Sequence, residues 1–142
     1  MDTMIDLAKR AVACEKWRWL PGMRTIARHL RDGESLRVVG LGTATGAAHT
    51  AHFGPSAARR TWVRNGGCIR SGAVLPDITD PATLGCLLAL VREALGDPRA
   101  FVMPDHADGI TWRIHSRKHP TRYAGKGTSE VAALVDALER AK

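Results

Sequence analysis

The strongest constraint on the fold is a capped amphipathic segment in the middle of the chain. Asp80 is a good helix N-cap, Pro81 suits the first helical position, and Gly96 suits the end of a helix. Between them, apolar residues recur every three or four positions and form one stripe: Leu84, Leu87, Leu88, Val91 and Leu95. The pattern predicts a helix over residues 81–95 with one buried face, so the rest of the chain must supply a surface that this face covers.

Two more helices are expected, one near each end of the chain. The first covers residues 3–16, with Asp2 or Thr3 as its N-cap, and the last begins after Thr128 or Ser129. Each carries an apolar stripe at helical spacing: Met4, Leu7, Ala8, Ala11 and Val12 in the first, and Val131, Leu134, Val135 and Leu138 in the last.

The segments between the helices have the period of strands. Short strands are expected over residues 23–27, 34–39, 60–64, 69–75 and 99–103, with turns at Asp32-Gly33 and Asn65-Gly66-Gly67. In residues 109–115, Ile110, Trp112 and Ile114 alternate with Thr111, Arg113 and His115, which predicts one buried face and one exposed face. Residues 119–124 are expected to pair with this strand.

The order of helix, strands, helix, strands, helix predicts an α+β fold. We expect an antiparallel sheet with about three helices, N-terminal, central and C-terminal, packed on it. A chain of 142 residues is long enough to bury its own core, and it is expected to form a single domain over residues 1–142.

Charge is the most informative number for function. The chain has 21 Lys and Arg against 14 Asp and Glu, a net charge of +7, which favours anionic partners. Two runs without any Asp or Glu, residues 35–76 and 109–129, hold ten of these cations. The sheet is therefore expected to be the positive surface. Its candidate anion-binding residues are Arg113, His115, Arg117, Lys118 and Arg122, followed by Arg59, Arg60 and Arg64.

Catalytic and metal signatures are weak in this sequence. Gly40 to Gly46 is a Gly-x-Gly-x-x-x-Gly variant of the dinucleotide fingerprint, but Pro55 leaves little room for a following helix and no acidic residue appears until Asp77. Residues 40–58 are therefore expected to form a loop, with anion binding by its N–H groups left open. His49 and His52 have the spacing of two metal ligands on one helical face, without paired partners to complete a site. We predict no set of catalytic residues, no bound metal and no cofactor.

Cysteine usage and hydropathy favour a cytoplasmic protein. Three cysteines without a Cys-x-x-Cys pair are typical of a reducing compartment. The N-terminus carries acids where a secretory signal has cations, and no apolar stretch approaches the roughly 20 residues needed to span a bilayer.

Three segments of the chain look familiar: residues 10–23, with Trp17-Arg-Trp19-Leu-Pro21-Gly22, residues 75–98, with Leu75-Pro-Asp77-Ile-Thr-Asp80-Pro81, and residues 129–139. Together they resemble a family of small uncharacterised proteins of tailed bacteriophages and prophages. The resemblance covers about half the chain and implies an accessory phage protein in the cytoplasm of a bacterial host. The family has no assigned activity, so it supplies no functional residue.

Together these observations predict a non-enzymatic phage accessory protein that binds a nucleotide or nucleic acid on a basic sheet surface, with action against host defence as one role open to it. The alternatives are a protein–protein effector that docks on an acidic host protein, and a small enzyme without a visible signature. Self-association is left open. No membrane partner is expected.

Overall fold

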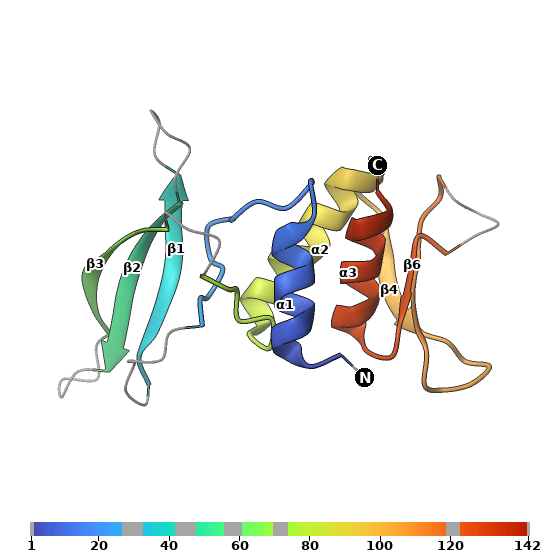
Figure 1. The fold of residues 1–142 in the computed structure, drawn as a ribbon, viewed down its shortest axis with the longest axis horizontal. Helices are drawn as coiled ribbons and strands as arrows, with labels where there is room; N and C mark the ends of the chain where they lie inside the picture. The colour runs from blue at the N-terminus through green and yellow to red at the C-terminus, as the bar shows by residue number, and fades with distance from the viewer. Residues whose placement is uncertain are drawn as a thin grey trace. The chain divides into compact units, whose positions relative to one another are not determined.

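The computed structural model describes residues 2–26, 33–41, 48–55, 61–69, 74–118 and 123–141, with the backbone alone at residues 41, 55 and 61–68. These residues form the expected α+β architecture, with three helices and two three-stranded antiparallel sheets (Figure 1). The contacts divide the chain into two compact units. Unit 1 comprises Met1–Arg18 and Leu84–Lys142, and unit 2 comprises Trp19–Thr83. The single domain over residues 1–142 stays a prediction.

Unit 1 is built around helix α3 (Glu130–Arg140). The Ser129 hydroxyl accepts a hydrogen bond from the Ala132 N–H at 3.1 Å and caps the helix, as expected. The predicted apolar stripe is confirmed, because Val131, Leu134, Val135 and Leu138 are all buried. Helix α3 lies between helix α1 (Met4–Ala13) and a sheet, and contacts both (Figure 1).

Helix α1 begins with a capping box. The Thr3 hydroxyl accepts from the Asp6 N–H at 3.1 Å, and the Asp6 carboxylate accepts from the Thr3 N–H at the same distance. Leu7, Ala8 and Ala11 are buried. The helix ends at Ala13, three residues before the predicted end.

Helix α2 (Pro81–Leu95) has the predicted bounds. The Asp80 carboxylate accepts a hydrogen bond from the Thr83 N–H at 3.0 Å, and Gly96 ends the helix with a φ of 61°. Its fully buried apolar residues are Leu87, Leu90 and Val91, whereas Leu88 is half-buried. The inner face is therefore rotated slightly from the predicted stripe.

The sheet of unit 1 has the order β4-β5-β6, with β4 at Phe101–Pro104, β5 at Trp112–His115 and β6 at Gly125–Gly127. Ile114 is fully buried, as predicted. Ile110 was expected to be buried but is 70% exposed, because it precedes β5 in a turn that the Asp108 carboxylate organises. Strand β5 pairs with β6. Of the expected partner segment 119–124, residues 119–122 lie outside the described residues, and the Ala124 N–H donates to the Ile114 carbonyl of β5 at 3.0 Å.

Unit 2 contains the second sheet, with the order β1-β2-β3. Strand β1 is Ser35–Leu41, β2 is Ala48–Pro55 and β3 is Thr61–Ile69. The prediction of a loop over residues 40–58 is wrong for residues 48–55, which form β2. The buried residues of this strand include Ala48 and Ala51, whose side chains are too small to give an alternating apolar pattern.

The ends of unit 2 also differ from expectation. Strand β3 continues through Asn65-Gly66-Gly67, where a turn was expected, and the register shifts by one residue between Thr50 and Ala51 opposite this segment. In the expected 23–27 strand, of which residues 23–26 are described, Arg24 and Thr25 pair as isolated bridges. The end of β3 at Ile69 is described, but residues 70–73 of the expected 69–75 strand are not.

Candidate functional site

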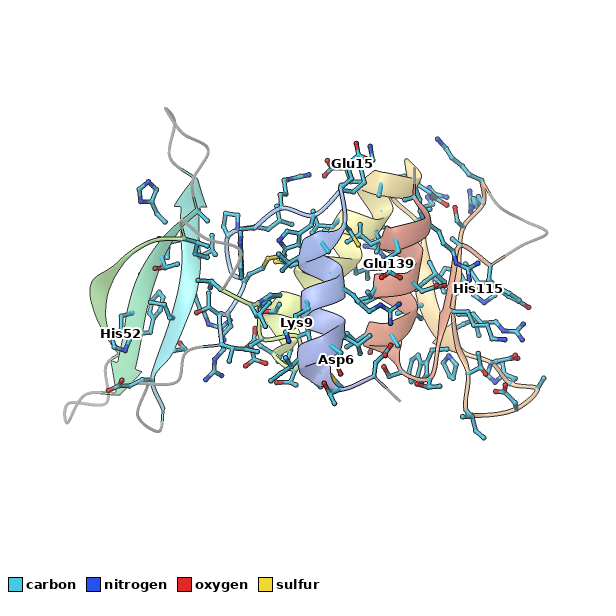
Figure 2. The ribbon with its side chains drawn as sticks, in the orientation of Figure 1. Asp6, Lys9, Glu15, His52, His115 and Glu139 are labelled. Atoms are coloured by element: carbon cyan, nitrogen blue, oxygen red, sulfur yellow. The ribbon has the colours of Figure 1, made fainter. Side chains whose placement is uncertain are left out.

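The candidate site is the face of the unit 1 sheet that points away from α3. We call it the outer sheet face and define it by Phe101 on β4, Arg113 and His115 on β5, Lys126 on β6, and Tyr123 just before β6. The register places Phe101 opposite His115, and Arg113 opposite Lys126. Figure 2 shows His115 on this sheet, on the side away from α3.

The opposite face of the sheet is closed by α3. A β-carbon at Gly125 or Gly127 would collide with the backbone of α3 around Ala133, so these strand positions lie against the helix. Because side chains alternate along a strand, Lys126 must point outward. The close approach of β6 and α3 therefore determines which side chains reach the outer sheet face.

Three rings lie in a row on the outer sheet face. The rings of Phe101 and His115 are stacked, with centroids 5.2 Å apart and an angle of 14° between the planes. His115 meets Tyr123 edge to face, at 5.4 Å and 87°. Phe101 is 48% exposed and Tyr123 is 43% exposed, so both keep a large open surface. We call Phe101, His115 and Tyr123 the ring cluster.

Arg113 sits on this cluster and is neutralised there. Its guanidinium carbon lies 3.9 Å from the centre of the Tyr123 ring, a cation–π geometry. It also forms an ion pair with Asp105, and the side chains of Arg113 and Asp105 are only 22% and 12% exposed. The basic sheet surface was expected to gather five cations without a carboxylate. Asp105 shows that this is not so, because it reaches Arg113 from the turn that follows β4.

The end of β5 is tied down by a second carboxylate. Asp97, which follows α2 and is buried, accepts hydrogen bonds from the Ser116 hydroxyl at 2.7 Å and from the Arg117 N–H at 2.8 Å. The Ser116 hydrogen bond is the main reason that the pKa of Asp97 is lowered. These bonds fix the backbone from which Arg117 and Lys118 project, and both side chains are exposed.

Lys118 points to α2 and not to the ring cluster. A β-carbon on Gly96 would lie 3.0 Å from the Lys118 ammonium nitrogen, which places this cation at the C-terminal end of α2. A cation is favourable there because the helix dipole and the unsatisfied carbonyl groups are negative. The Lys118 ammonium therefore interacts with the end of α2, whereas Arg117, two residues after His115, is an exposed cation.

The structure gathers only part of the predicted residue set. Arg113 and His115 lie on the same face of β5, and Arg117 follows the end of this strand. Arg122, Arg59 and Arg60 lie outside the described residues. Arg64 pairs with His52 in the backbone register of unit 2, and its side chain is not described.

The weaker motifs of the sequence fall in unit 2. His49 and His52 were considered as two ligands on one helical face, but they lie on β2, where residues three apart point to opposite faces. His52 instead has its Nε2 3.1 Å from a Glu34 carboxylate oxygen. Gly40 lies within β1 at a register shift, and residues 42–47 of the Gly40 to Gly46 segment are outside the described residues. Among the residues that are described, no three His, Cys, Asp or Glu side chains converge as metal ligands would.

Three residues of the site were missed by sequence reasoning. Phe101 and Tyr123 were predicted only as members of strands, and Asp105 lay in the unassigned segment between two predicted strands. A signal was available for Asp105, because a hairpin between residues 101–104 and 112–115 brings the residue after β4 close to the start of β5. Tyr123 had no such signal, since its contact with His115 joins residues eight positions apart that the strand pattern alone does not bring together.

Searches against protein family models, curated proteins and solved structures gave no match. The resemblance to phage proteins therefore stays a prediction. Within the described part of the chain, none of the helices has the length and apolar character needed to cross a membrane.

Proposed function

We propose that this chain is a non-enzymatic protein that binds nucleic acid on the outer sheet face. The observation that carries the proposal is the ring cluster, in which Phe101 and Tyr123 are nearly half exposed, on a sheet that also carries the exposed cations Arg117 and Lys126. Cations next to exposed rings contact phosphates and bases at the same time. The excess of seven positive charges supports an anionic partner, since it attracts polyanions over long distances.

The exposed surface favours a nucleic-acid chain over a free nucleotide. The rings of Phe101 and Tyr123 are each nearly half exposed on the face of a sheet, and Lys126 and Arg117 are exposed beside them. A mononucleotide binds tightly when a concave pocket surrounds it. A polymer instead gains affinity from several contacts spread over an open face.

The biological setting follows from the resemblance to phage proteins. We propose that the chain acts on nucleic acid in the cytoplasm of a bacterial host during phage growth. Interference with a host defence system is one such role.

The test reverses charges beside the ring cluster without touching the rings. Arg117→Glu combined with Lys126→Glu should weaken binding of a fluorescent oligonucleotide roughly tenfold or more at low salt, because two phosphate contacts are lost. Arg113→Glu is unsuitable, since it would place two carboxylates together at Asp105. Fluorescence anisotropy measures the binding, and thermal unfolding checks the fold.

The matched control is Lys9→Glu combined with Lys16→Glu. It changes the net charge by the same amount on exposed residues of the N-terminal segment, and Figure 2 shows Lys9 on α1, on the other side of α3 from the sheet. Affinity should fall much less in this control. An equal loss in both double variants would indicate attraction by net charge alone and would contradict a site on the outer sheet face.

Docking on an acidic protein is the second candidate. It is favoured by Ile110, which is 70% exposed on the turn before β5, together with the exposed ring of Phe101. Exposed apolar side chains ringed by cations are typical of protein interfaces. A chain that binds no oligonucleotide at low salt would favour this candidate.

A further inference from the structure

We infer that the nucleic acid recognised on the outer sheet face is single-stranded and that its unpaired bases stack on Phe101 and Tyr123. This inference rests on the proposed function and specifies its ligand. It follows from a comparison of the cations on this face, which mostly contact other protein groups, with the aromatic rings, which remain exposed.

The cations closest to the ring cluster are largely engaged within the protein. Arg113 is ion-paired with Asp105 and covers one face of Tyr123. Lys118 lies at the C-terminal end of α2. Duplex binding without stacking depends on phosphate contacts from many available cations. Among the described residues, Arg99, Arg117 and Lys126 are exposed cations within a few residues of the rings, a small number of cations for gripping a duplex.

The rings, in contrast, are open and held in place. One face of Phe101 is stacked on His115, and one face of Tyr123 is covered by Arg113, yet both residues remain close to half exposed. Each ring therefore offers one further surface on which a base can stack. Bases in a duplex are stacked on each other and do not present their faces, whereas unpaired bases do.

Asp105 strengthens this preference in two ways. It holds the Arg113 guanidinium on Tyr123, so the ring is oriented before the ligand arrives and less side-chain entropy is lost on binding. Its negative charge also neutralises the cation nearest the rings. The phosphates are then drawn outward to Arg117 and Lys126, while the bases lie on the rings.

The experiment compares oligothymidylate of twelve nucleotides with a twelve-base-pair duplex by fluorescence anisotropy on the full chain. The parent should bind the single strand at least about tenfold more tightly, because each stacked base contributes substantially to affinity. Phe101→Leu and Tyr123→Leu should each weaken this binding roughly 5- to 150-fold. Phe101→Tyr and Tyr123→Phe keep a ring and should stay within about twofold of the parent.

Salt dependence gives an independent measurement. Two phosphate contacts on a single strand predict a slope of about −1.4 in a plot of log affinity against log salt concentration, whereas five would give about −3.5. Ile110→Ala is the control for loss of an exposed apolar side chain, and it should leave binding of the single strand unchanged. Thermal unfolding shows whether each variant is folded. If a leucine variant is unfolded, Phe101→Tyr and Tyr123→Phe, together with the parent's preference for single strands, still test the inference.

Two results would overturn the inference, and they are distinguishable. Equal affinity for strand and duplex, with Phe101→Leu and Tyr123→Leu unchanged but Arg117→Glu with Lys126→Glu weakened, would leave nucleic-acid binding standing and remove the stacking mode. If neither oligonucleotide binds even at low salt, the proposed function itself is wrong and the inference is lost with it.

Discussion

Asp80 shows how one buried side chain can serve two structures at once. Its carboxylate caps α2 through the Thr83 N–H, and it accepts two hydrogen bonds from the Arg37 guanidinium, at 2.7 and 2.8 Å. Arg37 also donates to the Gly22 carbonyl at 3.0 Å. The hydrogen bonds from Arg37 and Thr83 favour the charged carboxylate, and those from Arg37 are the main reason that the pKa of Asp80 falls to about 2.

The pKa of Asp80 predicts how stability changes with acid. Because the folded pKa is below the ordinary value of 3.8, the stabilisation is present above pH 3.8 and is lost as the pH falls towards 2. Asp80→Asn should therefore lower the free energy of unfolding by about 2 kcal/mol at pH 7. The difference between variant and parent should shrink steadily between pH 4 and pH 2.5 in urea titrations.

Glu93→Gln is the matched control for this variant. It removes a carboxylate that pairs with Arg18, but this pair is exposed to solvent and should contribute little to stability. A loss in Asp80→Asn that is the same at pH 7 and pH 3 would assign the effect to packing and would contradict the role of the charge.

At the scale of elements, the contact between β6 and α3 determines the orientation of the outer sheet face. Gly125→Ala should destabilise the protein by roughly 1–3 kcal/mol, because the added methyl group would collide with the Ala133 carbonyl and the Ala137 backbone, which cannot move aside as a flexible side chain can. Chemical denaturation measures the effect, and the heat-induced transition should move to lower temperature.

The same substitution at Gly85 should have the opposite sign. Gly85 lies within α2, and a β-carbon there would meet nothing within 4 Å. Alanine is a better helix former than glycine by about 1 kcal/mol, so Gly85→Ala should stabilise the protein by up to that amount. If both variants moved in the same direction, the close packing of β6 on α3 would not be the cause.

Helices could be predicted from the sequence far better than strands. Thr3, Asp80 and Ser129 are local signals, and each caps a helix where a cap was predicted. Strand β2 could not be found, because its pairing with β1 and β3 leaves no local mark in the sequence, and Ala48 and Ala51, which it buries, have low strand propensity. At the site, the alternation in β5 correctly placed Arg113 and His115 outward. It could not show that Asp105 and Tyr123 converge on them, since those contacts depend on turns.

At the scale of the whole molecule, unit 1 is assembled from both ends of the chain. Its core joins α1 and α3 with part of α2 and the β4-β5-β6 sheet. The Arg18 guanidinium donates to the Glu93 carboxylate at 2.5 and 2.6 Å, so the point where the chain leaves unit 1 is held against α2. Every residue of the ring cluster belongs to unit 1. Unit 2 is therefore an insertion that the proposed binding does not use.

Unit 1 should fold and bind without unit 2. Glu93 lies 13 residues after Asp80, roughly 20 Å along the helix axis, and about twelve Gly and Ser residues span a similar distance. Replacing residues 20–79 with such a linker, with the Asp80 cap kept, should leave a helical protein with one cooperative unfolding transition. It should bind oligothymidylate within about threefold of the full chain, because Phe101, Arg113, His115 and Tyr123 are all retained. Adding Gly125→Ala to the shortened chain should destabilise it as in the full chain, which checks that the same fold is present. A shortened chain that is unfolded by circular dichroism would instead support a single domain over residues 1–142, in which unit 2 is required for folding.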